Sequence, residues 1–337
     1  MNSSFLFGRT CFLVLLGTLA VCVPQKLSAE DTKKSLTHFE VPAPKKLNPK
    51  NPILLIGLEP YLGRKMENGL LGPDLILNSY NKNNNITLKD ANGILHKASQ
   101  INIIWDEFTL EKPQHYSRKI YGPFASFESA EMLWKELASQ GIESFIANPK
   151  NWEVWTAKET KLLDSNNVSN HIEKTLSQIK PLIKGPFGSI ELTGPIRIEA
   201  PDGLLWKEGF YKGPFWLKKN AYGTWTFIEE IPMSRYLAGV IPYEIGSNSP
   251  LAALAAQTVL ARTWALANSH RYEIDGYHLC SDTQCQVYKE PLRFNRNIKE
   301  AISMTKGKFL IWKDMPIHAV YHASNGGVMA TLEEAWH

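Results

Sequence analysis

Short segments in which apolar and polar residues alternate, separated by turns rich in Gly and Pro, fill the chain between residues 189 and 228. A period of two places every second side chain on one face, which is the pattern of a half-buried β-strand. Turn residues between such segments favour antiparallel pairing. The expected strands are 189–193, 196–200, 215–217 and 224–228. This stretch therefore requires an antiparallel sheet.

A helix pattern follows this sheet. Ser249 suits the N-cap and Pro250 suits the first helical position. Apolar and small residues then recur at helical spacing, at Leu251, Leu254, Thr258, Ala261 and Ala265. We therefore predict an α+β fold of mostly antiparallel sheets with a few packed helices.

The first half of the chain has the same mixed character. Apolar runs at 53–57 and 101–105 predict strands, and a helix is expected from a cap at Ser126 to Gly141, followed by a strand at 144–147. Residues 180–188 are rich in Lys, Pro and Gly and indicate a domain boundary. The length allows two domains, which we place at residues 51–179 and 189–337.

Residues 1–29 have the composition of an export signal. Arg9 precedes an apolar run at 11–23, and Ala29 offers a small residue for cleavage. The run is shorter than the roughly 20 residues that a membrane-spanning helix needs. We therefore expect cleavage and export to the periplasm or cell envelope, with an uncleaved signal as the sole contact with a membrane.

Residues 30–50 are charged and polar without periodicity, which predicts a linker. Removing residues 1–29 takes away Arg9 and Lys26 and no acid, so the formal net charge falls from +4 by two, to +2. Binding of nucleic acid needs a concentrated basic surface. No nucleic-acid partner is therefore expected.

Glu244 is the sole acidic residue between Ile231 and Tyr272. Pro242 and Gly246 frame it and predict a tight turn among apolar neighbours. Desolvation disfavours the charged form of a carboxyl group, so the pKa of Glu244 should rise toward the range of a general acid. Glu244 is the candidate for catalysis, with an ordinary surface glutamate as the alternative.

Two cysteines remain after the expected cleavage, Cys280 and Cys285. With His278 they could supply three ligands to zinc. The spacing is not that of a zinc finger, and it fits a small disulfide of an exported protein equally well. The residues alone leave zinc and disulfide open.

Residues 317–327 alternate again and end in Gly326 and Gly327. This pattern predicts a strand that brings Tyr321, His322 and Ser324 to a tight turn. Glycine allows backbone to approach a ligand closely there.

Residues 236–244, 250–265, 280–288 and 321–327, in this order, resemble the family of sporulation stage II protein D, which includes the amidase-enhancer LytB proteins. The first of these reads Tyr-Leu-Ala-Gly-Val-Ile-Pro-Tyr-Glu. Members of the family continue beyond the position of His337, so the resemblance implies that the catalytic domain is truncated at its C-terminal end here.

The resemblance implies a lytic transglycosylase of peptide-stripped peptidoglycan strands, with Glu244 as general acid and base. It places Gln257 and Arg262 in the substrate groove. The polar and glycine residues of the later motifs are further candidates for substrate binding: Gln286, Tyr288, Tyr321, His322, Ser324, Gly326 and Gly327.

In some members a structural zinc is held by cysteines that match Cys280 and Cys285, and the histidine of that set corresponds here to His278 or His270. The LytB branch also implies a function of a different class, a non-catalytic glycan-binding enhancer of an amidase. The expected partners are peptidoglycan glycan strands and, in the second case, an amidase.

Residues 121–141 resemble half of a SPOR module, a family that binds septal peptidoglycan stripped of its peptides. The same residues fit an ordinary α+β supporting domain.

Overall fold

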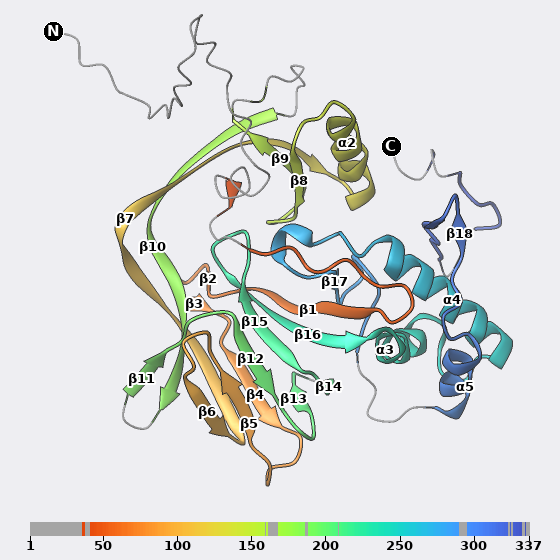
Figure 1. The fold of residues 1–337 in the computed structure, drawn as a ribbon, viewed down its shortest axis with the longest axis horizontal. Helices are drawn as coiled ribbons and strands as arrows, with labels where there is room; N and C mark the ends of the chain where they lie inside the picture. The colour runs from red at the N-terminus through yellow and green to blue at the C-terminus, as the bar shows by residue number, and fades with distance from the viewer. Residues whose placement is uncertain are drawn as a thin grey trace, which may run out of the picture.

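The computed structural model describes residues 36–37, 41–158, 160, 168–185, 188–207, 209–289, 295–322, 324, 326–331 and 334, so the expected signal peptide lies outside the described residues. The fold is α+β, as predicted from the sequence. Two large sheets share one core, and the helices lie at the top and at the right of the view in Figure 1.

The first sheet has seven strands and joins residues from both halves of the chain. Its parallel pair is β17 with β1, and its other neighbours in the described residues are antiparallel. In spatial order the strands are β17 (Leu279–Cys280), β1 (Ile53–Leu62), β16 (Trp225–Pro232), β15 (Phe215–Lys219), β12 (Ile196–Glu199), β5 (Ile86–Lys89) and β6 (Leu95–Ala98).

The second sheet has eight strands and contains the longest pair of the molecule. Strands β7 and β10 curve together from its lower part to α2, as Figure 1 shows. The strands are β11 (Gly188–Glu191), β10 (Val168–Gly185), β7 (Gln100–Phe124), β4 (Leu75–Ser79), β13 (Leu204–Trp206) and β14 (Gly209–Tyr211), with β9 (Trp152–Ala157) on β7 and β8 (Ser144–Ala147) on β9. Two small hairpins are β2 (Arg64–Lys65) with β3 (Leu71–Gly72), and β18 (Ile311–Trp312) with β19 (Met315–Pro316).

Three helices pack together beside the end of the first sheet (Figure 1). They are α3 (Met233–Ile245), α4 (Leu251–Ala267) and α5 (Arg296–Met304). Helix α2 (Phe127–Ser139) lies apart from them, near β8. A short 3-10 helix, η1, spans Glu273–Asp275. Among the described residues, no helix combines the length and the apolar character needed to cross a membrane.

Strand β16 shows how the sequence builds the core. Trp225, Phe227, Glu229 and Ile231 are fully buried at alternate positions, so they share the inward face of the sheet. The same core contains Leu237 of α3 and other apolar residues of the helices. The direct connection from β16 into α3 therefore positions that helix on the core.

The sequence predicted several elements correctly. Helix α2 begins after Ser126, whose Oγ accepts the backbone N–H of Ser129 at 3.1 Å, and β8 spans the predicted residues 144–147. The predicted strands of the region 189–228 are present as β11, β12, β15 and β16.

Three expectations differ from the structure. The predicted strand at 317–327 does not form in the residues of this range that the structure describes, and residues 317–322 run without regular structure. Helix α4 is not capped by the side chain of Ser249, because its hydroxyl donates instead to the Ile245 carbonyl at 2.5 Å, at the end of α3. Residues 41–50 are not a free linker, since Val41 is buried and the Lys45 carbonyl bonds to His278.

The boundary expected at residues 180–188 does not divide the sheets. Strand β10 continues to Gly185, and β1 pairs with β16 along most of its length. Strand β4 likewise pairs with β13. Residues on the two sides of the boundary therefore share both sheets and one core.

Candidate functional site

Glu244 lies in the last turn of α3, and Gly246 ends this helix with a φ of 80°. The sequence predicted a tight turn here, but Pro242 is accommodated inside the helix instead. The carboxyl group is half-buried, and this burial raises its pKa above the ordinary value. Hydrogen bonds from the Tyr321 hydroxyl and the Val287 backbone N–H act in the opposite direction without cancelling the rise. Glu244 is therefore better able to hold a proton near neutral pH than an exposed glutamate.

Tyr321 connects Glu244 to the interior. Its Oη accepts a hydrogen bond from Gln286 Nε2 at 2.8 Å, and the hydroxyl also bonds to the Glu244 carboxyl. Burial raises the pKa of Tyr321, and the Glu244 charge adds to this rise. The phenol therefore stays protonated, and its proton is directed at the carboxylate.

Two further tyrosines support this arrangement from behind. Tyr236 Oη donates to Gln286 Oε1 at 3.0 Å, which fixes the orientation of that amide. The ring of Tyr236 stacks on Tyr288 with centroids 5.5 Å apart, and Tyr288 Oη donates to Glu229 Oε2 at 2.9 Å. Gln286 and Tyr288 are 2% and 1% exposed. Both side chains are enclosed by these contacts in this conformation, which suits a positioning role, and their expected role in substrate binding stays a prediction.

Glu229 is a buried carboxylate that the sequence reasoning missed. Its Oε1 accepts the backbone N–H groups of Lys212 at 3.1 Å and Gly213 at 2.9 Å, and its Oε2 accepts the Tyr288 hydroxyl. The alternation of β16 could have revealed it, because Glu229 falls on the same face as Phe227. These bonds satisfy the carboxylate and anchor the tyrosine pair.

The two groove residues expected on α4 lie in different places. The Gln257 side chain lies against the Tyr321 hydroxyl and is 7% exposed. Its amide nitrogen is buried without a well-formed hydrogen bond to any described residue. Arg262 is 5% exposed, and its Nη1 donates to the Lys308 carbonyl at 2.8 Å. Arg262 lines a different cavity, so the structure brings Gln257 but not Arg262 to Glu244.

The segment after Tyr321 is exposed. His322, Ser324, Gly326 and Gly327 all lie at the surface. The two glycines have φ values of 61° and 96°, in the left-handed region, so the expected Gly-Gly turn is present although the strand before it is not. Ser324 Oγ accepts the Gly326 N–H at 3.4 Å.

Cys280 and Cys285 form a disulfide, with Cα atoms 5.7 Å apart. A disulfide sulfur is not a thiolate and does not serve as a zinc ligand. The bond closes the loop that precedes Gln286. Of the two alternatives left open by the sequence, zinc and disulfide, the structure contains the disulfide.

The two candidate histidines do not complete a zinc site. The Nδ1 of His278 accepts the Leu55 N–H at 2.9 Å and its Nε2 donates to the Lys45 carbonyl at 2.9 Å, so both ring nitrogens are occupied. Burial lowers the pKa of His278 and favours this neutral form. His270 bonds through Nε2 to Glu131 at 2.8 Å. The described residues contain no group of three metal-ligating side chains, and the expected zinc does not fit this arrangement.

Comparisons with known proteins cover the same segment. Residues 221–312 match the family described as SpoIID, Stage II sporulation protein. The match includes α3, α4, Glu244, Gln257 and the disulfide, and it ends before Tyr321.

The Amidase enhancer of Bacillus subtilis is 39% identical over 100 residues, which are 30% of this chain and 13% of that protein. An uncharacterized protein of Brachyspira hyodysenteriae is 29% identical over 119 residues, 34% of this chain and 31% of that protein. Stage II sporulation protein D of Bacillus subtilis is 28% identical over 124 residues, 32% of this chain and 36% of that protein. The matches thus span between 13% and 36% of these relatives. Residues 221–312 are thus similar to the SpoIID/LytB family, in agreement with the resemblance found in the sequence.

Proposed function

We propose that the chain is a lytic transglycosylase of the cell envelope that cleaves peptide-stripped peptidoglycan strands. The observation that carries this proposal is the environment of Glu244. Its pKa is raised by burial, and its carboxyl group is held by Tyr321 and Val287. The relatives named Amidase enhancer and Stage II sporulation protein D support a role in cell-wall turnover.

A single carboxyl group is sufficient for this reaction. Protonated Glu244 donates its proton to the glycosidic oxygen between N-acetylmuramic acid and N-acetylglucosamine, and the bond from that oxygen to the anomeric carbon breaks. The resulting carboxylate accepts the proton of the 6-hydroxyl of the muramic acid while this oxygen bonds to the anomeric carbon. The product is a 1,6-anhydro sugar, and no water is consumed. Hydrolytic glycosidases use a second carboxylate for the step that the substrate itself performs here.

The neighbours of Glu244 suit both steps. The hydrogen bonds run in one direction, from Tyr236 through Gln286 to Tyr321 and then to Glu244. This order leaves the Tyr321 hydroxyl as a donor to the carboxylate that forms after the first proton transfer. Tyr321 is thus a positioning residue that stabilises the charged form without removing the raised pKa.

Glu244→Gln tests the proposal. General acid–base catalysis contributes about 10²–10⁴-fold to a rate, so the variant should lose at least about 100-fold in the release of anhydro sugars from peptide-free strands. Mass spectrometry of the products from both proteins measures this loss. Glu230→Gln is a matched control, because Glu230 is a partly buried glutamate of β16 outside the site. Normal amounts of anhydro product from Glu244→Gln would refute the assignment.

A non-catalytic enhancer of an amidase is the second candidate, favoured by the name of the relative that is 39% identical. In this case the protein binds glycan strands and raises the activity of an added amidase, while it releases no sugar fragment on its own. Product analysis with the protein alone and with a purified cell-wall amidase separates the two functions. Stimulation that persists in Glu244→Gln, together with no anhydro product from either form, would favour the enhancer.

A further inference from the structure

A separate cavity lies at the opposite end of α3 from Glu244. The helix rises about 1.5 Å per residue, so its first turn is roughly 16 Å along the axis from Glu244. A cavity of about 520 Å³ opens there between residues 49–52, the start of α3, α4 and the end of α5. Neither Glu244 nor Tyr321 lines it.

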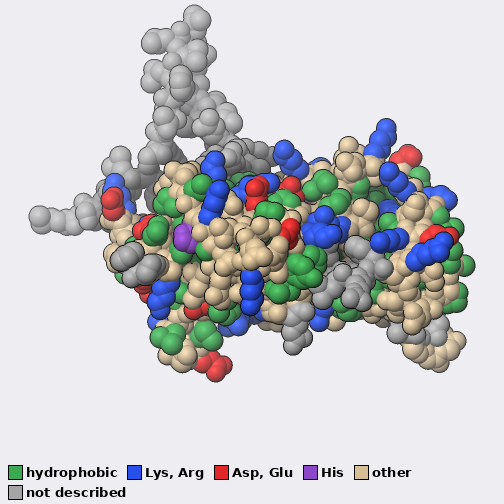
Figure 2. Space-filling view, turned by 90° about the horizontal axis from the view of Figure 1, so that it is seen from below, with side chains coloured by type: hydrophobic (Ala, Val, Ile, Leu, Met, Phe, Trp, Pro, Cys, Tyr) green, Lys and Arg blue, Asp and Glu red, His purple; other side chains and the backbone are tan. Residues whose placement is uncertain are grey.

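The lining of this cavity is basic. It contains five Lys or Arg side chains and no Asp or Glu among the described residues, namely Lys50, Arg235, Arg262, Lys299 and Lys306. Figure 2 shows that Lys and Arg side chains also gather over the helical end of the molecule, on the right of the view. Cations concentrated in a hollow repel one another and attract anions.

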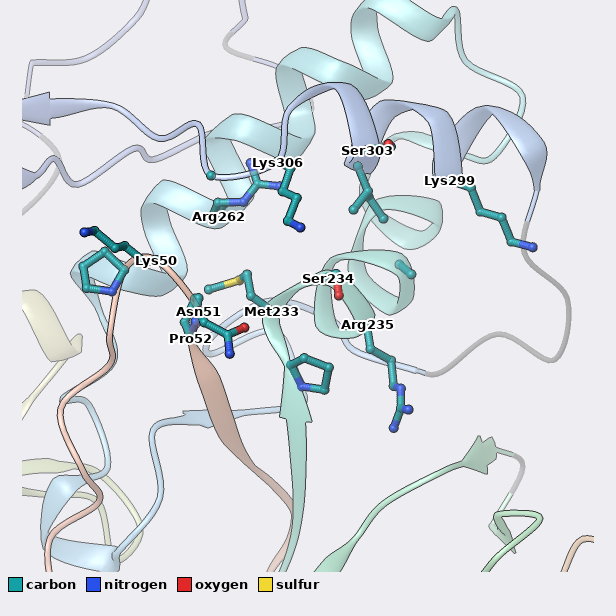
Figure 3. Close-up of a pocket in the computed structure, with 15 residues that line it drawn as sticks. Lys50, Asn51, Pro52, Met233, Ser234, Arg235, Arg262, Lys299, Ser303 and Lys306 are labelled. Atoms are coloured by element: carbon teal, nitrogen blue, oxygen red, sulfur yellow. The ribbon is translucent and has the colours of Figure 1, made fainter.

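Three of the lining side chains converge. Figure 3 shows Arg262 and Lys306 extending toward the middle of the cavity, with Ser234 facing them from α3. Arg235 and Lys299 extend away from this centre. The bond from Arg262 Nη1 to the Lys308 carbonyl fixes the orientation of the guanidinium, and the residue as a whole is 5% exposed. Such a guanidinium is preorganised for bidentate contact with an oxyanion.

The first turn of α3 adds to this positive potential. Pro232 is the N-cap residue and provides no side-chain hydrogen bond. The Met233 N–H donates to the Pro52 carbonyl at 3.0 Å, and the other N–H groups of the first turn lack a side-chain cap. A helix N-terminus carries about half a positive charge and favours anions. Ser234 and Arg235 of this turn line the cavity beside Arg262 and Lys306. The helix end and the converging side chains therefore act on the same space.

We infer that this cavity binds a sugar-sized molecule that carries a phosphate or carboxylate group. The volume lies within the range of about 300–1,000 Å³ that is typical of small-molecule sites, so it exceeds what a lone ion fills. The oxyanion contacts Arg262, Lys306 and the first turn of α3, while the rest of the molecule occupies the remaining space. This site is independent of the reaction proposed for Glu244.

Calorimetric titrations of the purified chain at low ionic strength test this inference. The probes are N-acetylglucosamine 1-phosphate and N-acetylmuramic acid, with inorganic phosphate as the bare anion and N-acetylglucosamine as the neutral control. The neutral sugar should bind at least tenfold more weakly than one of the two charged sugars. The stronger charged sugar identifies the source of the oxyanion as phosphate or carboxylate, and inorganic phosphate should bind more weakly than that sugar.

Lys306→Gln and Lys299→Gln form a matched pair of variants. Both lysines are exposed and lie on α5 or just after it, so neither substitution disturbs the core. Lys306→Gln should weaken binding of the charged sugar about tenfold or more, because a hydrogen bond to a charged group is lost. Lys299→Gln should change it by less than about threefold, since this side chain points away from the centre. Equal effects of the two variants, or equal binding of charged and neutral sugars, overturn the inference, as does the absence of binding to either charged sugar.

Discussion

Removal of the Tyr321 hydroxyl provides a direct test of how Glu244 is tuned. Tyr321→Phe keeps the ring but deletes the hydrogen bond that favours the Glu244 carboxylate. Because this bond lowers the pKa of Glu244, its loss must raise that pKa further. The structure therefore predicts both the sign of the change and the group that shows it.

The magnitude follows from the strength of the bond. A hydrogen bond to a charged group contributes about 1.5–3 kcal/mol, and one pKa unit corresponds to about 1.4 kcal/mol. Glu244 is half-buried, so solvent screens part of this interaction. We therefore expect the lower part of that range, about 1.5 kcal/mol in favour of the protonated form, which appears as a rise in the pKa of Glu244.

Titration of the side-chain carboxyl carbon of Glu244 by NMR measures the shift without relying on activity. If Glu244 is the general acid, the alkaline limb of the pH–rate profile should move to higher pH by the same amount, since the protonated form persists to higher pH. Tyr243→Phe is the matched control, because Tyr243 is adjacent in sequence but 49% exposed. An unchanged or lowered pKa of Glu244 in Tyr321→Phe would refute this account of the site.

Three further predictions concern the framework of the site. Burial alone would raise the pKa of Glu131, but its bonds to His270 and Lys135 lower that pKa to about 2. The Glu131 carboxylate therefore stabilises the folded state above its unfolded pKa near 4.5, and this stabilisation is lost as the pH falls through about 2. Urea unfolding between pH 2 and 6 should show a smaller loss of stability in Glu131→Gln than in the native chain. Replacing both Cys280 and Cys285 by Ser should lower the free energy of unfolding by about 2 kcal/mol, by the loop-entropy relation for a six-residue loop. A thiol assay of the unfolded, unreduced chain that finds both cysteines free would contradict the disulfide. Gly239→Ala would place a Cβ 2.5 Å from the Tyr288 ring and 3.0 Å from the Lys289 carbonyl. We therefore expect the free energy of unfolding to fall by about 1–3 kcal/mol. An unchanged melting temperature would show that Tyr288 is not held as tightly as described.

Local patterns in the sequence predicted what local chemistry determines. Helix α2 follows from the Ser126 cap and its apolar spacing, and strands such as β12 and β16 follow from alternation. The candidate Glu244 was also identified locally, from a lone acid among apolar neighbours. Its raised pKa agrees with that reasoning, although the residue sits in a helix rather than in a turn.

Features that depend on distant residues were not predictable in this way. The pairing of β7 with β10 joins residues far apart in sequence, and the middle of β7 contains a run of exposed residues, 111–115, that resembles a loop. The position of Arg262 depends on the Lys308 carbonyl, which no spacing within α4 reveals. The partners of His278 are backbone groups of Leu55 and Lys45, so its sequence proximity to Cys280 was misleading.

The pairing of β1 with β16 has a practical consequence for work on shortened versions of this protein. A fragment that starts at residue 189 would keep Glu244 and the disulfide but would leave β16 as an open edge, with Leu54 and Ile56 no longer covering its neighbours. Uncovered strand edges recruit other chains and promote aggregation. Expression of this fragment by itself should thus yield insoluble material, and co-expression with residues 41–62 offers a route to recover it.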